Sequence, residues 1–393
     1  MSWEKVTGYL DSLKDRYECR CVDCKVVQGH KEIYRHMTGT MDFQNSIPLQ
    51  RDNLFDVYSA TKVITMVAAM QLIEQGKLSL KDELSDYLPE YKEMKVVMDF
   101  DLSDFVKGAK FISGWPSEAE YKTKPAKNAI RIEHLMSMTA GMSYQISNPA
   151  VLELLAQNPH AKTREIVARY ATAPLLYEPG ERYAYSLGHD VMAAVIEVVS
   201  GLQFSEYMKK NIFEPLECKD IYYHITDPQR MVCLYNGKNP ETGELIPHTF
   251  NFARINDTYE SGGGGILCSV DDYSKVIDAL ACKGIGANGA QILKPESIKA
   301  MSTNRLNPQQ LEDFHIGGKH EYGYGLGVRT LMDTSASKSP LGEFGWDGAQ
   351  GAYVLVDPQN ELSVFYVQAA PDNGPAFATI HPTLRDLIYE AIQ

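Results

Sequence analysis

A nearly uninterrupted apolar run over residues 63–73 constrains the fold of this chain more than any other feature. The run contains no charged residue and stops shortly before Gly76, a residue type that commonly ends helices. A helix that is apolar on all sides has to pass through a core. The run begins directly after Ser59-Ala60-Thr61-Lys62, and residues three apart are neighbours on a helix. The sequence therefore predicts a buried helix with a hydroxyl and an amine on one face near its start.

The pairing of Ser59 with Lys62 has two interpretations. A buried lysine loses basicity and can hold or take the proton of a hydroxyl, which turns that hydroxyl into a nucleophile. Alternatively, Ser59 caps the helix and Lys62 lies on the surface. The same spacing occurs at residues 2–5 and 335–338, but a chain terminus and a polar loop are not expected to bury a lysine. Spacing alone favours the helix cap, so other sequence features have to distinguish the cap from the nucleophile.

Length and composition narrow the class of protein. A chain of 393 residues exceeds the usual single core, so we expect two lobes. Its net charge of -13 argues against nucleic acid or an anionic membrane as partner and leaves small molecules as candidate substrates. The first residues lack the apolar core of a signal peptide, and no later run is long enough to span a membrane. We therefore expect a cytoplasmic protein.

Seven cysteines without a secretion signal indicate reduced thiols. The spacing of Cys19, Cys21 and Cys24 could begin a metal site, but no matching Cys/His pair follows at zinc-finger spacing. Buried thiols of a strand explain the cluster as well. We expect no metal and no cofactor.

Strand-like segments occur early and late, and helical patterns lie between them. Such a distribution fits one sheet built from both ends of the chain. We expect an α/β (α+β) fold, with an antiparallel sheet flanked by N- and C-terminal helices and a mainly helical inserted lobe. One lobe would comprise residues 1–58 and 231–393, and the helical lobe residues 59–230. The expected strands are residues 20–27, 31–38, 231–235, 324–330, 351–356 and 362–368, and the expected terminal helices are residues 3–16 and 383–392.

The glycine run at residues 262–265 does not have the spacing of a phosphate-binding loop or a dinucleotide-binding fingerprint. A flexible turn is the better interpretation, because Ser269 and Asp272 form a capping-box start for a following helix. The chain also has no G-x-S-x-G and no H-E-x-x-H motif, so a conventional α/β-hydrolase or zinc protease is not indicated.

Six segments resemble, in the same order, the motifs of the serine β-lactamase and penicillin-recognising enzyme superfamily. The first is the Ser59–Lys62 tetrapeptide, and the others resemble its "RHLLTHTSGL", "PGxxFxYS", "GGLxSTxxDxxRF" and "YGYGLG" segments and its last active-site strand. Together they span most of the chain and imply a β-lactamase/transpeptidase-like fold. In this sequence they are residues 59–62, 131–142, 179–186, 262–272, 322–327 and 345–348.

The resemblance implies that Ser59 is the nucleophile, Lys62 its proton partner and Tyr185 the phenol that completes the base. A phenol titrates near pH 10 and an ammonium nearby favours its ionised form, so Lys62 and Tyr185 can share a proton. Without the resemblance, Tyr185 would be interpreted as a core aromatic, because it is one of 23 tyrosines.

Two motif positions depart from the β-lactamases. Trp346-Asp347-Gly348 stands where they have K-T-G, and Leu187 stands where they have an asparagine. Both changes remove polar groups that recognise the drug, and W-x-G is similar to the carboxylesterase and acyltransferase branch of the superfamily. The resemblance implies that the amides of Ser59 and Ala349 form an oxyanion hole, because Gly348 allows close backbone approach. Trp346, Asp347 and Leu187 would line the substrate pocket, although Trp346 could also be only an apolar lid.

These implications favour a serine hydrolase that forms an acyl-enzyme and acts as a carboxylesterase or acyltransferase on small or medium acyl substrates. No glutamate is placed as a deacylating base, so Lys62 and Tyr185 would also activate water. The alternatives are a D-amino-acid peptidase or weak β-lactamase of the same superfamily, and a non-catalytic binding protein with the same fold. Loops at residues 100–127 and 304–321 are expected to shape the pocket. The sequence determines neither the oligomeric state nor the acyl acceptor.

Overall fold

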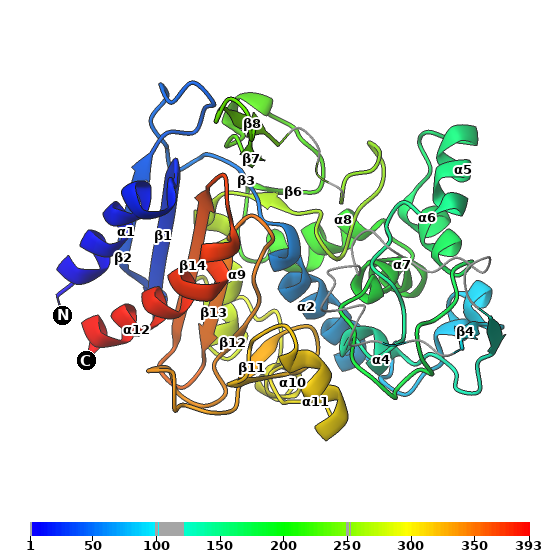
Figure 1. Ribbon diagram of the computed structural model, residues 1–393. Coiled ribbons are helices and arrows are strands. Elements are labelled where there is room, and N and C mark those ends of the chain that lie inside the picture. Colours follow the sequence, from blue (N-terminus) through cyan, green and yellow to red (C-terminus); the bar gives the residue numbers. More distant parts are fainter. Residues whose placement is uncertain (1, 99–100, 102–121, 249–250, 252) are drawn as a thin grey trace.

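The computed structural model describes residues 2–98, 101, 122–248, 251 and 253–393. In these ranges the largest sheet has seven strands in the order β10-β11-β12-β13-β14-β1-β2. All neighbouring strands in it are antiparallel, as expected, and the β14–β1 pair joins strands from opposite ends of the chain (Figure 1). The strands are β1 (Cys21–Gln28), β2 (Lys31–Gly39), β10 (Tyr322–Tyr324), β11 (Arg329–Leu331), β12 (Phe344–Gly345), β13 (Tyr353–Asp357) and β14 (Leu362–Ala369).

The predicted terminal helices are present and lie side by side on one face of this sheet (Figure 1). They are α1 (Glu4–Tyr17) and α12 (His381–Ile392). Leu10 of α1 and Leu384 of α12 are buried in one apolar core with Val364 of β14. Burial of these apolar helix faces against the sheet holds the two ends of the chain together.

The opposite face of the sheet is covered by α9 (Val270–Ala281). Ser269 accepts a hydrogen bond from the Asp272 amide, so the predicted cap starts this helix. The ring of Tyr273 stacks on Phe365 of β14 with ring centres 4.0 Å apart. The Tyr273 hydroxyl donates to the Ala60 carbonyl at 2.8 Å. In this way α9 connects the sheet to the segment that carries Ser59.

The apolar run forms α2 (Thr61–Glu74), which is buried along most of its length and packs against α7 (Gly188–Ser200). Where residues 59–230 are described, they contain more helices than strands. We keep the division into two lobes as a proposal. The remaining helices are α4 (Ile132–Met136), α5 (Pro149–Gln157), α6 (Thr163–Tyr170), α8 (Phe204–Met208), α10 (Pro295–Met301) and α11 (Pro308–His315).

The other strands are short and form three small sheets within the described ranges. They pair in the orders β3-β9-β6, β4-β5 and β7-β8. Their bounds are β3 (Phe55–Asp56), β4 (Lys95–Val97), β5 (Thr123–Pro125), β6 (Ile221–Tyr222), β7 (Tyr235–Lys238), β8 (Leu245–Pro247) and β9 (Leu267–Cys268).

Two strand predictions are wrong in detail. Residues 231–235 are mostly a loop whose buried Val232 and Leu234 imitate the apolar pattern of a strand, and β7 begins only at Tyr235. Residues 324–330 are interrupted by a tight turn, in which the Gly325 amide donates to the Val328 carbonyl at 2.8 Å. The left-handed backbone of Gly327 (φ 81°) lets the chain reverse there, so β10 and β11 form a hairpin.

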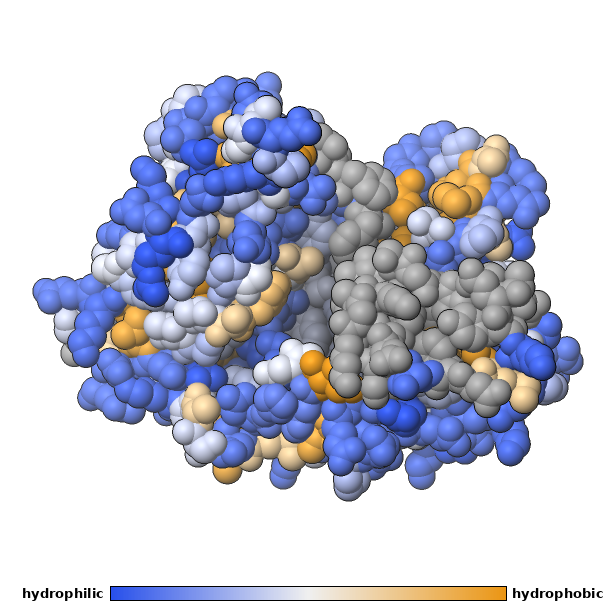
Figure 2. Space-filling model, viewed as in Figure 1, coloured by the Kyte–Doolittle hydropathy of each residue, from blue (hydrophilic) through white to orange (hydrophobic). Residues whose placement is uncertain are grey.

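Hydrophilic residues cover most of the coloured part of the face in Figure 2, and apolar residues appear there in small separate groups. No helix among the described residues has the length and apolar character needed to span a membrane. All seven cysteines are free thiols. Cys21 and Cys24 are buried in β1, as the strand interpretation predicts, whereas the buried Cys19 lies before this strand.

Candidate active site

Ser59 lies in a short 3-10 turn, Tyr58–Ala60, directly before α2. Tyr58 has a left-handed backbone (φ 45°), a conformation that costs free energy for a bulky residue and often occurs at functional sites. Ala60, not Ser59, occupies the cap position of α2, and Lys62 is completely buried. The interpretation of Ser59 as a helix cap with a surface lysine is therefore wrong.

The Lys62 ammonium has three hydrogen-bond acceptors around it. Its Nζ lies 3.3 Å from Ser59 Oγ, 3.2 Å from the Tyr144 hydroxyl and 2.5 Å from the Gly263 carbonyl. An ammonium has three N–H donors, so these partners satisfy it without water. The structure thus holds Lys62 in one orientation beside Ser59.

Tyr185 completes the arrangement from the segment that precedes α7. Its hydroxyl donates to Ser59 Oγ at 2.7 Å, and Lys62 Nζ lies 4.7 Å from the centre of its ring. Trp346 Nε1 donates to the Tyr185 hydroxyl at 3.2 Å, and the two rings stack 5.6 Å apart. Four residues predicted for the site, from segments far apart in the sequence, therefore lie together.

The charge of Lys62 differs from the expectation. Burial lowers the pKa of the ammonium, but Tyr144, Tyr185 and the carboxylate of Asp190 raise it, and the net pKa lies above its usual value. The expectation that burial would make Lys62 less basic is therefore wrong, because it considered desolvation without these partners. Lys62 remains an ammonium at neutral pH.

Sequence reasoning missed Tyr144, which contacts both members of the predicted base. Its hydroxyl lies 3.2 Å from Lys62, and its ring stacks on Tyr185 with centres 5.2 Å apart and planes 8° from parallel. Burial raises the pKa of Tyr144 above its usual value, so it stays a neutral phenol. Tyr144 follows the segment at residues 131–142 by two positions, which is the only signal that could have found it.

Asp190 of α7 was also missed. Its side chain is buried, and Oδ1 accepts hydrogen bonds from Tyr259, Ser261 and the Gly263 amide. Oδ2 has no hydrogen-bond partner among the described residues. A Cβ atom at Gly263 would lie 2.4 Å from Asp190 Oδ2 and 3.2 Å from Lys62 Nζ, so glycine leaves this space open between them. The glycine run forms a turn at residues 262–264, as predicted, and it is a buried part of the site.

The segment that carries Trp346 directly follows β12 and is held in place by buried charges. Asp347 accepts from Arg329 at 3.0 Å and from Lys319 at 2.6 Å. Burial disfavours the Asp347 carboxylate, but Arg329 and Lys319 outweigh it and hold the pKa of Asp347 well below its usual range. The structure thus places Asp347 in an ion-pair network that fixes the segment around Trp346. It does not show the Asp347 carboxylate facing the hydroxyl of Ser59.

Gly348 lies against the backbone that leads to Ser59. A Cβ atom there would lie 2.2 Å from the Val57 carbonyl oxygen. The next residue, Ala349, is exposed. This close approach places Gly348 beside Val57, two residues before Ser59. An oxyanion hole formed by the amides of Ser59 and Ala349 stays a prediction.

Leu187 is buried, and its amide donates to the Ser143 carbonyl at 2.9 Å. It lines a small cavity together with Met142, Ser143 and Leu175. Leu187 thus packs against the segment that carries Tyr144. Of the two loops expected to shape the pocket, residues 100 and 102–121 lie outside the described residues, and residues 304–321 contain α11.

Comparisons with known proteins agree with this geometry. The model of a protein family described as Beta-lactamase matches residues 6–387. A lovastatin esterase of Penicillium rubens is 28% identical over 393 residues, covering 92% of this chain and 92% of that protein. Among solved structures, simvastatin synthase (LovD) from Aspergillus terreus superimposes with a TM-score of 0.79 at 22% identity, covering 99% of this chain and 98% of the other. EstCE1, a hydrolase with promiscuous acyltransferase activity, superimposes with a TM-score of 0.77 at 24% identity, and 98% of each chain is covered.

Proposed function

We propose that this chain, which belongs to the beta-lactamase family and is an enzyme of the serine hydrolase type, is a carboxylesterase or acyltransferase that forms an acyl-enzyme on Ser59. The observation that carries the proposal is the 2.7 Å hydrogen bond between Tyr185 and Ser59 Oγ beside a buried Lys62. A nucleophile within hydrogen-bond reach of a base, with the base oriented by a third group, is the arrangement that covalent catalysis requires.

In the first step, Tyr185 acts as the general base after its own phenolic proton has left to solvent, because the Lys62 ammonium beside it favours an ionised phenol. The Tyr185 oxygen then takes the proton of Ser59 Oγ as that oxygen attacks the acyl carbon. The N–H of Trp346 stabilises the same phenolate oxygen. The amides of Ser59 and Ala349 stabilise the negative oxygen of the tetrahedral intermediate. When the intermediate collapses, Tyr185 returns the proton to the departing alcohol, and the acyl group remains on Ser59.

In the second step, Tyr185 takes a proton from water or from a second alcohol, whose oxygen attacks the acyl-enzyme. The bond between the acyl carbon and Ser59 Oγ then breaks, and Tyr185 returns the proton to Ser59. Water as acceptor gives hydrolysis and an alcohol gives acyl transfer. Tyr144, Tyr185 and then Asp190 raise the pKa of Lys62 and so favour its ammonium form.

The surroundings of Ser59 favour neutral acyl substrates over peptides with a free carboxylate. A peptidase needs a cation to hold that carboxylate, and the indole of Trp346 cannot serve. Lys319 and Arg329 are cations near Trp346, but both are ion-paired with Asp347. The intact hydrogen bonds among Ser59, Lys62 and Tyr185 also argue against a non-catalytic binding protein, because binding alone does not require them.

A fluorophosphonate probe should label Ser59 and no other serine, because Ser59 alone among the described serines has both a tyrosine hydroxyl and a buried lysine ammonium at hydrogen-bond distance. The measurement is mass mapping of the adduct in the parent protein. Ser59→Ala should remove the label and Ser335→Ala, which changes the same spacing motif in a surface loop, should keep it. An adduct on Ser143 or Ser335, or active protein without an adduct, would contradict the assignment of the nucleophile.

A short activated ester should be preferred to a cephalosporin by at least about a hundredfold in kcat/KM, which corresponds to roughly 2.7 kcal/mol. The reason is that Trp346 and Leu187 offer no polar group to the drug's carboxylate and amide. Trp346→Lys should raise cephalosporin binding only modestly, since position 187 stays apolar. Parallel steady-state kinetics on both substrates test this preference, and efficient cephalosporin turnover by the parent would show that another cation recognises the drug.

A further inference from the structure

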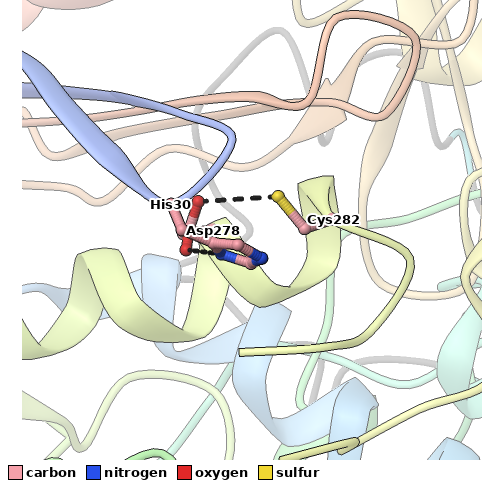
Figure 3. Close-up of side chains that lie close together, drawn as sticks. All are labelled: His30, Asp278 and Cys282. Atoms are coloured by element: carbon pink, nitrogen blue, oxygen red, sulfur yellow. Dashed lines mark hydrogen bonds and ion pairs between the residues drawn. The ribbon is translucent and has the colours of Figure 1, made fainter. Parts of the chain in front are cut away.

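Three side chains of types that bind transition metals meet at the end of α9 remote from Ser59 (Figure 3). His30 lies in the turn between β1 and β2, and Asp278 and Cys282 lie one turn apart at the end of α9. Residues four apart share one face of a helix, so Asp278 and Cys282 both face this turn. We refer to these three residues as the His30–Asp278–Cys282 cluster.

The ligand atoms of the cluster are close enough for one ion. His30 Nδ1 lies 2.8 Å from Asp278 Oδ2, Cys282 Sγ lies 3.7 Å from Asp278 Oδ1, and all the ligand atoms lie within 4.8 Å of one another. A tetrahedral zinc ion with bonds of about 2.0–2.3 Å needs its ligands about 3.3–3.8 Å apart. Small side-chain shifts would therefore bring the three atoms into coordination distance.

The chemistry of the ligands selects the class of cation. Imidazole nitrogen, thiolate sulfur and carboxylate oxygen together suit Zn²⁺, whereas Ca²⁺ and Mg²⁺ prefer oxygen ligands alone. Asp278 and the nearby Glu361 bring negative charge to the cluster. Burial, followed by the negative charges of Asp278 and Glu361, raises the pKa of the Cys282 thiol to about 12. A divalent cation would reverse this effect and stabilise the thiolate.

We infer that the His30–Asp278–Cys282 cluster is a zinc site in which three protein ligands leave the fourth position to water. The His30 side chain is one-third exposed, whereas that of Asp278 is 7% exposed, so an ion can enter from the His30 side. The site would link the β1–β2 turn to α9. Because α9 also supports the Ala60 carbonyl through Tyr273, the ion would stabilise the fold without contacting the reacting atoms. The inference does not depend on the proposed function.

The test is zinc binding by the whole chain after treatment with a chelator. Competition with a chromophoric chelator should show one equivalent of Zn²⁺, and Co²⁺ should give the charge-transfer absorption of a thiolate ligand. Cys282→Ser should weaken Zn²⁺ binding at least about a hundredfold and abolish the Co²⁺ band, because it removes one first-coordination ligand. His30→Gln should weaken binding to a similar extent. Cys233→Ser, the matched control for a partly exposed thiol outside the cluster, should bind like the parent.

Thermal unfolding provides a second measurement. Zn²⁺ binds the folded chain, so it should raise the Tm of the parent and of Cys233→Ser but not that of Cys282→Ser. Binding should also release protons and strengthen with rising pH, because the thiol must ionise. Circular dichroism of each variant verifies that it is folded. Absence of saturable binding by the parent, or equal binding by folded Cys282→Ser, would overturn the inference.

Discussion

Lys62→Met and Tyr185→Phe should each lower kcat on the order of a thousandfold or more, and the double variant should lose no more than either single variant. General-base catalysis and nucleophile activation act in the transition state, so the loss should fall on kcat more than on KM. The losses should not add, because Lys62 stabilises the ionised form of Tyr185 and removing either residue disables the same base. Steady-state kinetics with a short activated ester measure all three variants.

The comparison requires folded proteins, so the variants must match the parent in thermal unfolding. Removing the Lys62 ammonium leaves Asp190 as a buried carboxylate without a cation, which makes this control necessary. Additive losses would mean that Lys62 and Tyr185 act independently. If Tyr185→Phe turned over substrate nearly as fast as the parent, Tyr185 would be a core aromatic and not part of the base.

Arg329→Met should lower the free energy of unfolding by about 3–5 kcal/mol. Arg329 is 1% exposed and ion-paired with Asp347 and, at 3.6 Å, with Glu343, so its removal leaves carboxylates in the core that have lost a partner. Arg164→Met is the matched control, because Arg164 pairs with Glu90 at the surface and its loss should cost less than about 1 kcal/mol. Urea unfolding of the parent and both variants measures the difference. Equal effects of the two substitutions would contradict the role assigned to the buried network.

The same network gives a pH dependence with a definite sign. The pKa of Asp347 is lower in the folded chain than in the unfolded one, so its contribution is fully present above about pH 4 and is lost as the pH falls further. Arg329→Met removes the main attraction that lowers this pKa. The variant should therefore lose less stability than the parent between about pH 4 and pH 2, as measured by urea unfolding over that range.

The sequence predicts the elements of the fold best where local patterns are strong. The amphipathic α1, the β1–β2 hairpin and the fully apolar α2 form where periodicity and turn residues place them. The division of residues 324–330 into two strands could not be predicted, because it depends on a hydrogen bond across a glycine turn in an apolar segment. Neither could the loop character of residues 231–234, whose side chains are as buried as those of a strand.

The residues of the site could be predicted from the sequence, but their pKa values could not. The motifs indicate Ser59, Lys62, Tyr185 and Trp346, and the structure brings these four together. The pKa of Lys62 could not be predicted in the correct direction, because it depends on Tyr144 and Tyr185 and also on Asp190, which come from other segments of the chain. An isolated aspartate in an apolar helix carries no sign in the sequence that it will approach a particular lysine.

The pairing of β1 with β14 has a consequence for how the protein is made. Strand β1 ends at Gln28 and β14 begins at Leu362, so at synthesis rates of about 5–20 residues per second β1 leaves the ribosome roughly 20–60 s before its partner. During that time β1 can pair with β2, but its other edge, which later pairs with β14, has no partner, and an unpaired apolar edge promotes aggregation. Productive folding of the sheet therefore follows translation, and yield in a cell should depend on chaperones that protect β1 until β14 has been made.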